Sequence, residues 1–196
     1  MVELRKVASS NSSGVLRASL LREVSGSVTN PSSVVGNSIS ITSDQQIQPN
    51  SIDLTVEKVY EIKGVLALFK DGNRRQLPEY HPIHPFTMEY PEGESKMFIL
   101  EPDRRYQVEF NEKLNVPEYL CGITLVRSTM AKSGCSGENG LFDSGYSGPC
   151  GMMVSVQDTC YIERGASIAQ MIFLKAESSR LYNGYYQNTE SPLDWR

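Results

Sequence analysis

Alternation between hydrophobic and polar residues is the dominant pattern of this chain from residue 45 to residue 175. Ile52, Leu54 and Val56 alternate with polar side chains, and residues 106–110 repeat the same spacing. A period of two is typical of strands with one buried face. Runs rich in apolar residues predict further strands at 97–100, 121–126, 152–156, 159–162 and 168–174. Short strands separated by turns favour an all-β fold, either an antiparallel barrel or a jelly roll.

Helical spacing is found mainly near the beginning of the chain. Ser12 or Ser13 is a candidate N-cap. The apolar residues that follow share one helical face, and they are Val15, Leu16, Leu20, Leu21 and Val24. We therefore expect an N-terminal extension, residues 1–44, in which a short helix and short strands pack on a β core at 45–176. Residues 128–133 are a second candidate for a short helix.

Two polar segments between the predicted strands have specific interpretations. Residues 70–73 (Lys-Asp-Gly-Asn) predict a hairpin turn. His81 and His84, the two histidines of the chain, are separated by two residues, and a proline follows each of them. A metal site would need a third ligand and none is evident, so a rigid loop is the preferred interpretation.

Composition restricts the location of the protein and the class of its partners. The 196 residues, 39% of them hydrophobic, are enough for one domain with a core. No apolar run approaches the roughly 18 residues of a membrane span, and the N-terminus lacks the apolar segment of a signal peptide. The four cysteines include no Cys-x-x-Cys pair, which argues against a zinc site or a disulfide framework. We therefore expect a cytoplasmic protein without a membrane partner.

The net charge of −4 argues against a general nucleic-acid binder, which needs a basic surface. A small anionic ligand remains compatible with this charge. Such a ligand would require a local cluster of cations or a divalent metal ion.

The most informative segment is 141–148, Leu-Phe-Asp-Ser-Gly-Tyr-Ser-Gly. Two apolar residues lead Asp143 into a tight turn, and Gly145 and Gly148 allow the backbone to fold closely around a ligand. Tyr146 adds a flat aromatic face beside the acid. A carboxylate in this setting can orient a water molecule for attack. The alternative is an ordinary turn with a solvated aspartate.

Four segments in this order resemble the motifs of the dUTPase and dCTP deaminase superfamily. They are 48–54 (Gln-Pro-Asn-Ser-Ile-Asp-Leu), 127–132 (Arg-Ser-Thr-Met-Ala-Lys), 140–148 (Gly-Leu-Phe-Asp-Ser-Gly-Tyr-Ser-Gly) and 168–173 (Ile-Ala-Gln-Met-Ile-Phe). The resemblance implies a distorted jelly-roll β-barrel and a homotrimer with active sites between subunits. It also implies a deoxyribonucleoside triphosphate as ligand, Mg²⁺ as cofactor, and a C-terminal tail, residues 177–196, over the active site.

The superfamily contains two chemistries, and the residues favour one of them. In the diphosphatases an aspartate at the position of Asp143 directs water to the α-phosphorus, whereas the deaminases use a glutamate about ten residues later. Here that position is Met153, and no glutamate occurs between residues 144 and 162. Lys132 also replaces the usual arginine of the deaminases, and these two residue types are not interchangeable at a bidentate site.

The C-terminus resembles the other branch. The glycine-rich arm of ordinary dUTPases is missing, and 182–187 is similar to the deaminase tail, although Tyr185 stands where that tail has a lysine. We therefore predict a dUTP diphosphatase built on the deaminase-like branch. Two alternatives stay open: a dCTP deaminase or bifunctional enzyme, and a non-catalytic nucleotide-binding regulatory trimer.

The resemblance assigns a role to each candidate residue. Asp143 would orient the water, Tyr146 would lie under the deoxyribose, and Asp53 would hold magnesium through a water molecule. The expected triphosphate contacts are Arg127, Ser128, Thr129, Lys132, Gln170, Tyr182 and Tyr186. The structural alternatives are a packed aromatic for Tyr146, a salt bridge at a subunit interface for Arg127, a hydrogen bond across the trimer for Gln170, and a solvent-facing acid for Asp53.

The base is the least determined part of the ligand. The family contacts the pyrimidine through a hairpin just before the aspartate turn, here the polar, glycine-rich segment 134–140. Uracil is the family expectation, and cytosine or a modified pyrimidine are alternatives. Glu138 is a candidate contact for a base amino group, with a solvated loop acid as the simpler interpretation.

Overall fold

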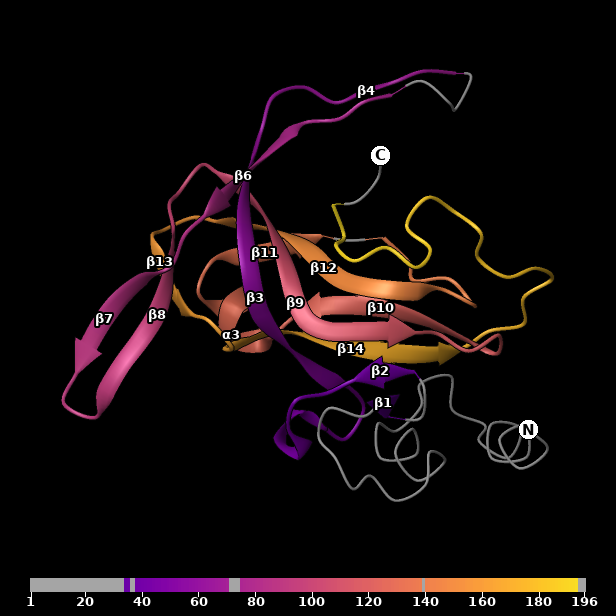
Figure 1. Cartoon of the computed structure of the whole chain (residues 1–196), viewed down its shortest axis with the longest axis horizontal. Coiled ribbons are helices and arrows are strands. Elements are labelled where there is room, and N and C mark those ends of the chain that lie inside the picture. Colours follow the sequence, from indigo (N-terminus) through magenta and orange to yellow (C-terminus); the bar gives the residue numbers. More distant parts are fainter. Residues whose placement is uncertain (1–33, 36–37, 71–74, 139, 194–196) are drawn as a thin grey trace.

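A nine-stranded sheet curves around the hydrophobic core as a nearly closed barrel (Figure 1). The computed structural model describes residues 34–35, 38–70, 75–138 and 140–193. The strands of this sheet are β1 (Val34–Val35), β2 (Ile39–Ser40), β3 (Ile52–Lys63), β6 (Glu79–Ile83), β9 (Arg105–Asn115), β10 (Leu120–Val126), β11 (Cys135–Glu138), β12 (Ser147–Val156) and β14 (Ser167–Lys175). The main path runs β1-β2-β9-β3-β14-β10, and β6 pairs with β3 while β12 joins β9 to β11.

The two ends of this sheet meet where β11 approaches β10. A Cβ atom on Gly137 would lie 2.5 Å from Cγ1 of Val126, so the absence of a side chain permits this approach. All pairings between the described strands are antiparallel. The predicted all-β barrel of the jelly-roll class is confirmed.

Two smaller sheets project from the barrel (Figure 1). One contains β7 (Phe86–Tyr90), β8 (Gly93–Leu100) and β13 (Cys160–Glu163), and the other pairs β4 (Ala67–Leu68) with β5 (Arg75–Gln76). The antiparallel pairing of β4 with β5 is the geometry that the predicted hairpin requires. Residues 71–74 of its turn, and the predicted N-terminal helix, lie outside the described residues.

Helical structure is minor in the described residues. The predicted second helix is present as the single-turn α3 (Ser128–Lys132), and a short 3₁₀ turn, η1 (Asp44–Gln46), precedes β3. No helix among the described ranges has the length and hydropathy that crossing a membrane requires.

The prediction of a rigid loop at 81–85 is wrong in part. His81 and Pro82 belong to β6, where Pro82 lies opposite Tyr60 of β3, and only His84 and Pro85 connect β6 to β7. Because β6 pairs with a single neighbour, proline can stand in it without breaking a ladder.

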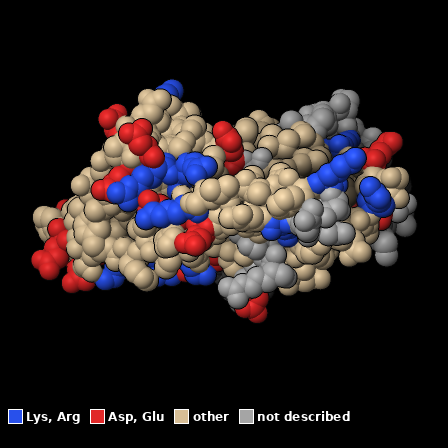
Figure 2. All heavy atoms as spheres, turned by 90° about the horizontal axis from the view of Figure 1, so that it is seen from above, with Lys and Arg blue, Asp and Glu red and all other residues tan. Residues whose placement is uncertain are grey.

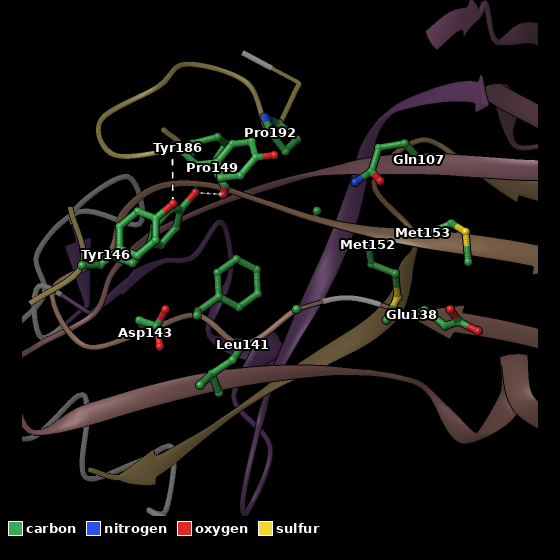
Figure 3. Close-up of a pocket in the computed structure, with 14 residues that line it drawn as sticks. Gln107, Glu138, Leu141, Asp143, Tyr146, Pro149, Met152, Met153, Tyr186 and Pro192 are labelled. Carbon is green, nitrogen blue, oxygen red and sulfur yellow. Dashed lines mark hydrogen bonds between the residues drawn. The ribbon is translucent and has the colours of Figure 1, made fainter. Parts of the chain in front are cut away.

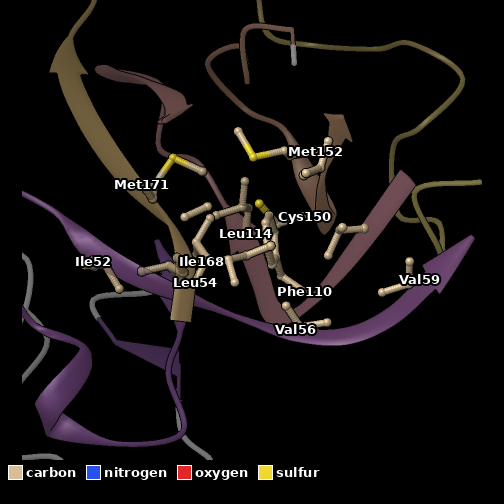
Figure 4. Close-up of a cluster of buried hydrophobic side chains, with 14 of the residues drawn as sticks. Ile52, Leu54, Val56, Val59, Phe110, Leu114, Cys150, Met152, Ile168 and Met171 are labelled. Carbon is tan, nitrogen blue, oxygen red and sulfur yellow. The ribbon is translucent and has the colours of Figure 1, made fainter. Parts of the chain in front are cut away.

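The core lies inside the barrel, between β3, β9, β12 and β14 (Figure 4). Leu54 and Val56 of β3, Phe110 of β9 and Met171 of β14 are all at most 3% exposed. The alternate residues of β3 are buried as well, since Asp53 is only 4% exposed. The alternative of a solvent-facing acid at this position is therefore wrong, because strand alternation does not show what covers the second face.

A buried carboxylate, Glu112 on β9, connects the strands beside Asp53. Its oxygens accept hydrogen bonds from the backbone N–H of Thr55 (2.9 Å), from Thr55 Oγ1 (2.7 Å) and from Gln46 Nε2 (2.5 Å). Burial raises the pKa of Glu112, while the Thr55 and Gln46 donors act in the opposite direction. Gln46 Nε2 also donates to the Asp53 carbonyl (2.9 Å), so this network fixes the backbone of β3 at Asp53.

Acidic and basic side chains are interspersed on the face seen in Figure 2. Ion pairs among the described residues include Arg104 with Glu101 (2.7 Å) and Lys63 with Glu61 (2.9 Å). The pair of Arg104 and Glu101 is exposed on both sides, and exposed pairs contribute little to stability, whereas the Glu61 side chain is buried. Figure 2 therefore shows no continuous basic surface on that face.

Candidate active site

A cavity of about 270 Å³ opens beside the turn that follows Phe142 (Figure 3). Four of the predicted site residues line it, namely Asp143, Tyr146, Tyr182 and Tyr186. Glu138 and Gly140, from the predicted base-contacting segment, line it too. The turn, the preceding hairpin and the C-terminal tail therefore converge on one hollow.

Hydrogen bonds to the neighbouring strand hold the Asp143 turn in place. Phe142 exchanges two backbone hydrogen bonds with Gly122 of β10 (2.8 and 2.9 Å), and Ser144 Oγ donates to the Leu120 carbonyl (2.7 Å). Gly145 adopts a φ of +84°, a conformation that a residue with a side chain rarely takes. The chain thereby reverses at Asp143.

The Asp143 carboxylate is exposed and accessible to a ligand. It also lines a second, wider cavity of about 860 Å³, so it lies at the junction of two hollows. Among the described residues, Asp143 has no hydrogen bond or ion pair that occupies its side chain. An acceptor in this position can hold a water molecule.

Tyr146 forms one wall of the smaller cavity. The ring is 5% exposed and its hydroxyl donates to the Pro149 carbonyl (2.7 Å). Its centroid lies 5.5 Å from that of Phe142 and 5.5 Å from that of Tyr182. Burial raises the pKa of Tyr146, so the hydroxyl stays protonated. Tyr146 is therefore a rigid packed wall that still faces the cavity.

The C-terminal tail packs on the same turn in the same chain. Tyr182 N–H donates to the Ser144 carbonyl (2.8 Å) and Asn188 N–H donates to the Ser147 carbonyl (2.7 Å). Gln187 makes two further bonds, because its Oε1 accepts from Ser147 N–H (3.0 Å) and its Nε2 donates to the Gly145 carbonyl (2.9 Å). The tail is thus attached by backbone and side-chain contacts beside Asp143.

The remaining candidates form a second cluster around Asp53. Its Oδ2 lies 3.3 Å from Arg127 Nη1 and 3.3 Å from Gln48 Nε2. Gln170 lies opposite Asp53 in the pairing of β14 with β3, and its Oε1 accepts from Ser51 Oγ (3.2 Å). Burial raises the pKa of Asp53, whereas the Arg127 guanidinium and the Gln48 amide act in the opposite direction.

The helix α3 continues directly from Arg127. Ser128, Thr129 and Lys132 are exposed on it, and the side chain of Arg127, which occupies the N-cap position, makes no capping hydrogen bond. These side chains are available for an anion, and Arg127 is the one that already has a carboxylate partner.

Within one chain the two clusters are well separated. Phe142 lies opposite Gly122, and Arg127 follows Gly122 by five residues along β10 and its end. At about 3.3 Å per residue the separation is roughly 16 Å. One chain therefore does not place Arg127 at the Asp143 cavity, and active sites between subunits, which the resemblance implies, would require such a separation.

The Asp53 cluster fits an indirect role toward magnesium. The described residues contain no group of three or more His, Cys, Asp and Glu side chains that could enclose a metal ion. Asp53 Oδ1, however, is buried and has no hydrogen-bond partner within the described ranges. Magnesium retains several waters and needs few protein ligands, so this oxygen fits an acceptor for a metal-bound water.

Residues that the sequence did not indicate complete the smaller cavity. Gln107, Met152, Met153 and Pro192 line it at the end away from Asp143 (Figure 3). Met153 was notable only as the position of the deaminase glutamate. Gln107 gave no signal of its own, because its place in the cavity depends on the pairing of β9 with β12.

Comparison with known proteins identifies the family of this chain. Residues 33–176 match the family model described as dCTP deaminase-like. A protein of Methanosarcina barkeri named probable deoxyuridine 5'-triphosphate nucleotidohydrolase is 36% identical over 160 residues, which cover 80% of this chain and 88% of that protein. A protein of Methanosarcina acetivorans with the same name is 33% identical over 149 residues, covering 74% of this chain and 82% of that protein.

Among solved structures, the 2'-deoxycytidine 5'-triphosphate deaminase from Agrobacterium tumefaciens has a similar fold. The TM-score is 0.59 at 18% identity, and the match covers 85% of this chain and 49% of that chain, so this chain spans about half its length. At this identity the likeness concerns the fold. Sequence and fold agree, and the chain belongs to the dCTP deaminase-like family, as its four motif segments predicted.

Proposed function

We propose that this protein is a dUTP diphosphatase that converts dUTP and water to dUMP and diphosphate. The observation that carries the proposal is the exposed Asp143 carboxylate at the mouth of a cavity walled by Tyr146, with Met153 where a deaminase has glutamate. The names of the two Methanosarcina relatives support the same activity.

In the proposed reaction Asp143 orients a water molecule toward the α-phosphorus and accepts its proton. A bond forms between the water oxygen and the α-phosphorus, and the bond from the α-phosphorus to the oxygen bridging to the β-phosphorus breaks. Diphosphate leaves with that electron pair, and the proton passes from Asp143 to solvent. The protein contributes position and charge, since little covalent chemistry is required of it.

Tyr146 supports the substrate from below. Its buried ring and its hydrogen bond to Pro149 fix the cavity wall against which a deoxyribose would lie. We infer that the wall leaves no room for a 2'-hydroxyl. Tyr182 and Tyr186 of the tail line the same cavity, and they would also contact the nucleotide.

The phosphates require the second cluster. Arg127, Ser128, Thr129, Lys132 and Gln170 would bind the phosphate oxygens, and arginine is well suited to this because it offers several donors in a fixed plane. Bound Mg²⁺ would supply neutralisation of phosphate charge. Asp53 would hold a water molecule of that ion through its unpaired Oδ1.

A homotrimer would bring the two clusters together. Because one chain separates Arg127 from the Asp143 cavity by roughly 16 Å, we infer that the phosphate-binding residues reach the cavity of a neighbouring copy. Sedimentation analysis should give three times the 21.9 kDa chain mass. Both the trimer and a cytoplasmic location rest on the sequence resemblance and composition.

The decisive experiment measures diphosphate and ammonia separately from a panel of nucleoside triphosphates with magnesium. Diphosphate from dUTP without ammonia from dCTP is expected. Asp143→Asn should lower kcat by about 10²- to 10⁴-fold, while Asp158→Asn, the same change in an exposed turn, should not. Intact dUTP with the wild-type trimer would refute the proposal, and nucleotide binding without turnover would favour the regulatory alternative.

A further inference from the structure

Three side chains form a row across the sheet at the end of the cavity away from Asp143 (Figure 3). Glu138 of β11 lies opposite Met153 of β12, and Met153 lies opposite Gln107 of β9. Directly opposed residues of antiparallel strands project from the same face, with Cβ atoms about 5 Å apart. Glu138 is therefore adjacent to the position where a deaminase has its glutamate, but it comes from the neighbouring strand.

The floor beside this row is flat and mainly apolar. Met152 and Met153 contribute thioether side chains, and Gly151 contributes bare backbone. A Cβ at Gly151 would lie 2.7 Å from the Val108 carbonyl oxygen and 2.8 Å from Gln107 Nε2, so no larger residue fits there. A planar ring can lie against such a floor and direct one edge toward Glu138.

Glu138 is the charged group at that edge. Its side chain is exposed, and within the described ranges it has no hydrogen bond or ion pair. An ionised carboxylate only accepts hydrogen bonds. Of the two pyrimidine edges, cytosine offers an exocyclic amine donor at the 4-position, whereas uracil offers a carbonyl oxygen there. A carboxylate at this edge is therefore complementary to cytosine.

We infer that Glu138 contacts the 4-amino group of a cytosine base and that dCTP is a second substrate of the same diphosphatase site. The inference rests on the proposed function, because Asp143 performs the same step on either nucleotide. Water adds to the α-phosphorus, the α-phosphorus bond to the bridging oxygen breaks, and the products are dCMP and diphosphate. The amino group stays on the ring.

The test compares diphosphate release from dCTP and dUTP, with ammonia measured in the same samples. Wild-type protein should hydrolyse both nucleotides. Glu138→Gln keeps the size but replaces one acceptor by an N–H₂ donor, which suits the uracil carbonyl. The glutamine Oε1 still accepts a neutral hydrogen bond, so the variant loses the difference between a charged and a neutral hydrogen bond. The ratio of kcat/KM for dCTP to that for dUTP should therefore fall by about 5- to 15-fold.

Glu94→Gln is the matched control, since Glu94 is an exposed glutamate on β8 outside the cavity. It removes the same charge and should change the ratio by no more than about twofold. An equal melting temperature for the two variants would exclude misfolding as the cause.

The outcomes separate the inference from the proposed function. Hydrolysis of dUTP without hydrolysis of dCTP, or an unchanged ratio in Glu138→Gln, would overturn the inference alone. If wild-type protein releases ammonia from dCTP and Glu138→Gln does not, Glu138 takes part in proton transfer to the base. That result would overturn the inference that Glu138 only binds the amino group. If neither nucleotide is hydrolysed, the proposed function fails. The role of Glu138 can then still be tested by calorimetry, as the ratio of the dissociation constants of the α,β-imido analogues of dCTP and dUTP.

Discussion

Gln187 provides a direct way to test whether the tail controls the candidate site. Its side-chain amide accepts from Ser147 N–H (3.0 Å) and donates to the Gly145 carbonyl (2.9 Å), so it clamps the tail to both sides of Tyr146. Gln187→Ala removes both bonds at once. The backbone bond from Asn188 N–H to the Ser147 carbonyl (2.7 Å) remains and reports on docking of the tail.

The expected magnitude follows from these two bonds. A neutral hydrogen bond contributes about 0.5–1.5 kcal/mol net, so the pair contributes about 1–3 kcal/mol. Loss of that free energy raises the opening constant of the tail by about 5- to 150-fold. Tyr182 and Tyr186 line the cavity, so we also expect KM for dUTP to rise.

Amide hydrogen exchange measures this opening at single residues. The Ser147 amide should exchange faster simply because its acceptor is deleted. The Asn188 amide should accelerate only if the tail itself opens more often. Asn183→Ala is the control, because Asn183 is exposed in the same tail. Unchanged exchange at Asn188 in Gln187→Ala would refute the clamp and would assign tail docking to the tyrosine rings.

Three further predictions concern stability. Arg127→Ala leaves the buried Asp53 carboxylate without its cation. Because Arg127 is itself partly exposed, the free energy of unfolding in urea should fall by about 1–3 kcal/mol. The double variant that also carries Asp53→Asn should recover part of this stability. Burial raises the native pKa of Asp53, so its contribution to stability falls as pH rises from the unfolded value of 3.8 through the raised native value. Asp53→Asn should gain stability relative to wild type over that window, and an equal pH profile for both proteins would contradict the shift. Gly137→Ala places a methyl group 2.5 Å from Val126 Cγ1, so thermal unfolding should show a free energy of unfolding lower by about 1–3 kcal/mol. Gly140→Ala is the control, because no atom lies within 4 Å of its Cβ position, and it should lose much less stability.

Most strands could be predicted because their signal is local. The alternation in 52–56 and 106–110 appears directly in β3 and β9, although both strands extend further, to Lys63 and Asn115. The extensions of both strands contain charged residues that pair with neighbouring strands, and their apolar residues have no regular spacing. The loop expected around His81 failed for the same reason, since pairing with β3 outweighed the proline signal.

The candidate site was predicted in its parts and not in its arrangement. The turn at Asp143 and the ring of Tyr146 follow from residues within one short segment, so their juxtaposition is local. The alternative of a solvent-facing Asp53 is wrong, because Gln48 and Arg127 lie against its carboxylate. A period of two describes one face of a strand and carries no information about what covers the other face.

The amino-acid sequence alone determined the β-class, the turn at Asp143 and the family, since each depends on spacing within a short stretch of chain. The tertiary structure decided that Arg127 and Asp143 lie at different places in one chain, and that Glu138, Met153 and Gln107 form one row across three strands. Both facts depend on the register between strands that are distant in sequence. Register is fixed by packing of the whole barrel, because a slip of one residue would exchange the buried and exposed faces of a strand.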